Sequence, residues 1–119
     1  MNKEHIYNFT IIWINKFKDE NVNYIELVDS DLGENYFNLG FEMDCGHSFI
    51  EKYGDIFFNV EEFEINIKII DNVQILGSAI YLKWRYFNHW AYSGSSILEP
   101  ENKKLFIIAL TRLAELTKE

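Results

Sequence analysis

The chain has few cysteines, prolines and glycines, and it has no long apolar run. Its single cysteine, Cys45, cannot form an internal disulfide, and one proline and six glycines leave little room for a linker. No apolar run approaches the roughly 20 residues that cross a bilayer, and the N-terminus lacks the apolar stretch and cleavage site of a signal peptide. The sequence therefore predicts a cytoplasmic protein.

Basic residues are also scarce, and their distribution is more informative than their number. Eleven Lys and Arg stand against nineteen Asp and Glu, which gives a formal net charge of -8. Residues 19–71 hold fourteen acidic and two basic residues, a balance of -12, whereas residues 1–18 (three basic, one acidic) and 72–119 (six basic, four acidic) each carry +2. A negative field repels phosphate backbones and anionic headgroups, so we expect neither nucleic acid nor membrane as a partner.

The residues that are abundant are those of a folded core. Of 119 residues, 48% are hydrophobic and 17% are aromatic. A chain of this size buries about two thirds of its unfolded surface on folding, which suffices for a core without disulfides or metal. No internal repeat is present, so we expect one domain over residues 1–119. The aromatic content also permits a homo-oligomer interface, although a crowded core explains it equally well.

Apolar residues recur at helical spacing in residues 4–18, in residues 73–91 and after Pro100. In 73–91 they fill more than half of the helical circumference, which predicts a central helix with two or more neighbours. Pro100 suits the first turn of the last helix, which we expect to run to about the C-terminus. The stripes of the first and last helices comprise Ile6, Phe9, Trp13 and Phe17, and Leu105, Ala109, Leu113 and Leu116.

Residues 24–44 alternate between apolar and polar on both sides of a turn-rich stretch, which predicts a β-hairpin. Residues 60–70 fit two patterns: a strand with Phe63, Ile65, Ile67 and Ile69 on one face, or a helix with Val60, Phe63, Ile67 and Ile70 in a stripe. We favour the helix. The assembled prediction is a small α+β domain, in which the hairpin at about 24–44 packs with four to five helices, including the central helix at about 73–91.

A narrow polar stripe on the 73–91 helix is the first candidate site. Its candidate ligand-binding residues are Ser78, Tyr81, Arg85 and His89, the last three spaced four residues apart. The guanidinium of Arg85 suits carboxylate or phosphate, and His89 titrates near neutral pH. The stripe would therefore bind a small anionic ligand or form an enzymatic site. Alternatively it is only a solvated helix face, or Arg85 pairs with the acidic hairpin.

Acidic residues on or beside the predicted hairpin are the second candidate site. These candidate partner-binding residues are Glu26, Asp29, Asp31, Glu34, Glu42 and Asp44. Like charges that face each other in a sheet lower its stability, so a basic partner would offset their repulsion. The alternative is that they serve solubility and edge protection. The leading hypothesis is a non-enzymatic binding domain that engages a basic protein, by analogy with inhibitors or immunity-type factors.

Other chemical motifs are incomplete. Cys45 and His47 are two residues apart, but no second Cys pair completes a zinc site. A nucleophilic cysteine needs a base and an orienting group within reach, which the spacing of these two residues does not establish. Residues 29–34 resemble the start of a calcium loop, but Gly33 falls one position early and Gly40 replaces the terminal glutamate. Phosphate-loop, dinucleotide-binding and hydrolase motifs are absent. We therefore predict no catalytic residue, no metal and no cofactor.

Overall fold

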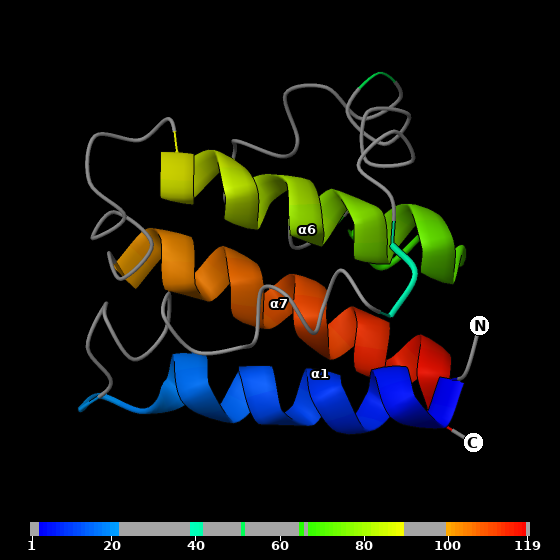
Figure 1. Ribbon diagram of the computed structural model, residues 1–119, viewed down its shortest axis with the longest axis horizontal. Coiled ribbons are helices and arrows are strands. Elements are labelled where there is room, and N and C mark those ends of the chain that lie inside the picture. Colours follow the sequence, from blue (N-terminus) through cyan, green and yellow to red (C-terminus); the bar gives the residue numbers. More distant parts are fainter. Residues whose placement is uncertain are drawn as a thin grey trace.

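The computed structural model describes residues 3–21, 39–41, 51, 65, 67–89 and 100–118, without the side chains of 82–89, 101 and 102. The described residues contain three long helices, α1 (Lys3–Lys18), α6 (Val73–His89) and α7 (Pro100–Thr117). In Figure 1, α7 lies between α1 and α6 and runs in the opposite direction to both. It packs against both helices, and more extensively against α1. The start of α1 and the end of α7 therefore lie at the same end of the molecule.

The helix predicted at residues 4–18 is confirmed as α1. Ile6, Trp13 and Phe17 are buried as the stripe predicts, whereas Phe9 is half-buried. Thr10 is also fully buried, and its hydroxyl donates a hydrogen bond to the carbonyl of Ile6 at 2.6 Å. This bond back to the preceding turn satisfies the hydroxyl and lets a polar residue lie in the core.

The predicted helix at 73–91 is confirmed as α6, which ends at His89. Asn72 caps its first turn: its Oδ1 accepts from the Ile75 amide and its carbonyl accepts from the Leu76 amide, both at 3.0 Å. An Asn at this position supplies partners for amides that have none inside the helix. Among the described helices, however, α7 and not α6 occupies the middle position.

Helix α7 begins at Pro100, as predicted, because a proline has no amide hydrogen to leave unpaired in a first turn. The predicted residues Leu105, Ala109 and Leu113 are buried. The buried stripe is wider than predicted, because Phe106, Leu110 and Ala114 are buried too. Leu116, which was also predicted to be buried, is half-buried. A helix between two neighbours needs such a wide apolar face.

Aromatic rings join α1 to α7. Phe17 stacks on Phe106, with ring centroids 5.0 Å apart and planes inclined by 8°. Along α1 the row continues through Trp13, which meets Phe17 edge-on at 6.0 Å, and then Phe9, tilted at 5.7 Å from Trp13. Offset and edge-to-face contacts of this kind add to the stabilisation that burial alone provides.

The prediction of an α+β fold with four to five helices is wrong. The described residues contain three long helices and no strand, and they form a small helical arrangement. Most of the predicted hairpin lies outside the described residues, but residues 39–41 fall in its second strand and form a turn instead. Gly40 has a φ of 96°, which an extended strand does not adopt. Phe41 is buried because it docks against α6, so the apolar alternation was misleading.

The ambiguous segment 60–70 follows the helical pattern where it is described. Ile65 and Ile67 are helical, and the Ile70 amide donates to the Ile67 carbonyl at 3.3 Å. Ile67 and Ile70 are buried, as the helical stripe requires, whereas Ile65 and Ile69 are exposed. A strand would have buried Ile65, Ile67 and Ile69 together on one face.

Candidate functional site

The polar stripe predicted on α6 is partly directed into the protein. Ser78 is fully buried, and Gln74, one turn earlier, donates through Nε2 to its hydroxyl at 3.5 Å. Tyr81 is half-buried and packs against the core. Arg85 and His89 belong to α6, so their spacing of one helical turn holds, but their side chains lie outside the described set. A ligand site at these four residues stays a prediction.

The acidic candidate residues are not placed by the structure. Glu26, Asp29, Asp31, Glu34, Glu42 and Asp44 all lie outside the described residues, as do Cys45 and His47. Within the described part of the chain, no three His, Cys, Asp or Glu side chains come close enough to share a metal ion. In the same part of the chain, no helix combines the length and the apolar character that crossing a membrane requires.

Sequence reasoning missed the contact between residues 39–41 and α6. The ring of Phe41 lies directly over Gly77, where a Cβ atom would come within 3.0 Å of the ring carbons Cδ1, Cε1 and Cζ. Gln74 holds the same turn by donating from Nε2 to the Gly40 carbonyl at 3.2 Å. The signal was Gly77 itself, because a glycine inside an otherwise apolar helix usually marks a close approach.

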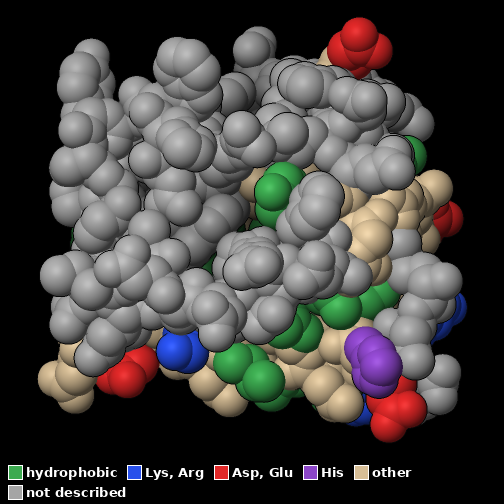
Figure 2. All heavy atoms as spheres, viewed as in Figure 1, with side chains coloured by type: hydrophobic (Ala, Val, Ile, Leu, Met, Phe, Trp, Pro, Cys, Tyr) green, Lys and Arg blue, Asp and Glu red, His purple; other side chains and the backbone are tan. Residues whose placement is uncertain are grey.

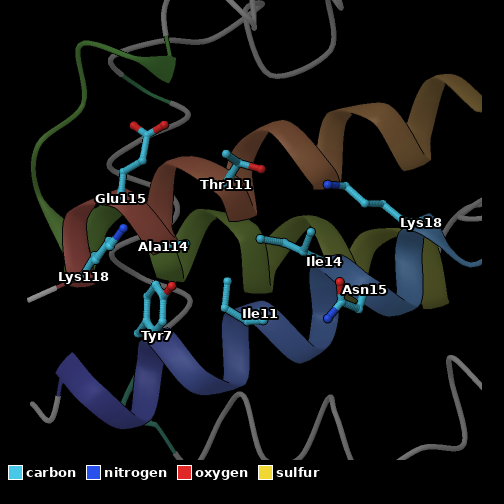
Figure 3. A pocket seen from close by; sticks show the side chains of 9 residues that line it. All are labelled: Tyr7, Ile11, Ile14, Asn15, Lys18, Thr111, Ala114, Glu115 and Lys118. Carbon is cyan, nitrogen blue, oxygen red and sulfur yellow. The ribbon is translucent and has the colours of Figure 1, made fainter.

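Sequence reasoning also missed a groove between α1 and α7, which encloses about 350 Å³. Figure 3 shows its side chains: five come from α1, three from α7, and Lys118 directly follows α7. They are Tyr7, Ile11, Ile14, Asn15, Lys18, Thr111, Ala114, Glu115 and Lys118. Ala114 contributes only a methyl group to this lining. Figure 2 shows hydrophobic side chains reaching the surface over α1.

The charges of this groove are predominantly positive. Lys18 and Lys118 lie at its opposite ends in Figure 3, and neither forms an ion pair with another described residue. The carboxylate of Glu115 points away from α1 and accepts a hydrogen bond from Arg112 Nη1 at 3.1 Å. The one acid that lines the groove is therefore already paired with Arg112.

A second hollow adjoins the groove, and Thr111 and Glu115 line both. It is lined by Ile67 and Lys68 together with α7 side chains that include Ile107, Ile108 and Arg112. The Arg112 side chain, which is about one fifth exposed, donates from Nε to the Ile70 carbonyl at 3.1 Å. This bond ties the segment 67–70 to α7.

The α1–α7 groove is lined by apolar side chains between two lysines. The nine residues of the α1–α7 groove include no His, Cys or Asp, and the hydroxyl of Thr111 is used in a 2.6 Å hydrogen bond to the Ile107 carbonyl. Apolar side chains with cationic ends are instead typical of a surface that binds another molecule. Comparisons with protein-family models, with curated proteins and with solved structures found no match to this chain.

Proposed function

We propose that the protein is a non-enzymatic binding protein whose acidic segment engages a basic protein partner in the cytoplasm. The observation that carries the proposal is the separation of charge along the chain, with -12 in residues 19–71 and +2 on either side. Within the candidate surface at residues 26–44 there are six acidic residues and no basic one. A surface of one sign accelerates the encounter with a partner of the opposite sign and disfavours other partners.

The way the helices pack is compatible with this use of the acidic segment. Helices α1 and α7 are joined by apolar and aromatic side chains, among them Phe17 and Phe106. Among the described residues the one ion pair that involves a Lys or Arg is Arg112–Glu115, within α7. The described contacts that join these helices are therefore apolar and aromatic rather than ionic.

The experiment compares capture of basic proteins by the native chain and by a variant with six neutralised acids. The variant carries E26Q, D29N, D31N, E34Q, E42Q and D44N. Six exposed acids elsewhere offer a control with the same change in net charge: E4Q, D19N, E20Q, E51Q, D71N and E115Q. Capture from a native lysate is measured at about 50 mM and about 300 mM NaCl, because screening weakens attraction between exposed charges.

We expect the native chain and the control variant to retain the same basic protein at low salt, and the variant with neutralised acids in residues 26–44 to lose it. Equal loss in both variants would mean that net charge, and not residues 26–44, attracts the partner. If no basic protein is retained by the native chain at either salt concentration, the proposal is wrong.

A further inference from the structure

We draw no further inference here: the strongest candidate, the apolar groove between α1 and α7 with Lys18 and Lys118 at its ends, carries none because nothing in the described part of the chain shows what covers it.

Discussion

The substitution G77A tests the contact that the sequence did not reveal, the docking of Phe41 on α6. A Cβ at position 77 would lie within 3.0 Å of three ring carbons, whereas carbon atoms in good contact are about 3.5–4.0 Å apart. The ring has little freedom to retreat, because Phe41 is 1% exposed and Gln74 binds the preceding carbonyl at 3.2 Å. The added methyl group must therefore displace the ring or the helix.

Two opposing terms set the size of the effect. Overpacking a core by a methyl group costs about 1–3 kcal/mol, and the overlap with a buried ring favours the upper part of that range. Alanine is better than glycine inside a helix by about 1 kcal/mol. We therefore expect a net loss of about 1–2 kcal/mol in the free energy of unfolding, or a melting temperature lower by roughly 3–10 °C for a domain of this size.

Urea denaturation followed by tryptophan fluorescence measures this loss, and a double-mutant cycle with F41L identifies its cause. Leucine lacks Cε1 and Cζ, two of the three atoms that the new Cβ would meet. In the F41L background G77A should be neutral or stabilising by up to about 1 kcal/mol, since the helix-forming preference of alanine then prevails. If G77A stabilises the native chain by that amount, Phe41 does not pack against Gly77 and the reasoning is refuted.

Two further substitutions test the ends and tethers of the helices by the same denaturation assay. N72A should lower the free energy of unfolding by about 1 kcal/mol. N72S should lower it by much less, because serine also caps a helix. Equal effects of the two substitutions would contradict the capping role of Asn72. R112A should lower the free energy of unfolding by about 1–2 kcal/mol, because the hydrogen bond to the Ile70 carbonyl is lost. E115Q should lower it by less than about 0.5 kcal/mol, because an exposed ion pair contributes little. A larger loss in E115Q than in R112A would show that the ion pair, and not the tether, stabilises this region.

The helices could be predicted from the sequence because their apolar periodicity is local. Trp13 and Phe17 in α1 and Leu105 and Leu113 in α7 recur at helical spacing and are buried. The start of α7 could be predicted as well, because Pro100 favours a first turn for a reason that depends on no distant residue.

The turn at residues 39–41 could not be predicted in this way. Phe41 is buried through a contact with Gly77, 36 positions along the chain, and alternation cannot distinguish this from one face of a strand. The groove between α1 and α7 escaped prediction for the same reason. Lys18 and Lys118 are separated by 100 positions, and only the antiparallel packing of the two helices makes them the ends of one surface.

The salt dependence of association is the most direct test of the claim that the acidic segment binds a basic protein. The purified chain and the basic protein that it captures are mixed by stopped flow at about 20 mM and about 300 mM NaCl. We predict that the association rate of the native chain falls by about tenfold or more at the higher salt, and that the variant with six neutralised acids in residues 26–44 binds slowly at both. An association rate that is independent of salt, or unchanged when these six acids are neutralised, would contradict the claim.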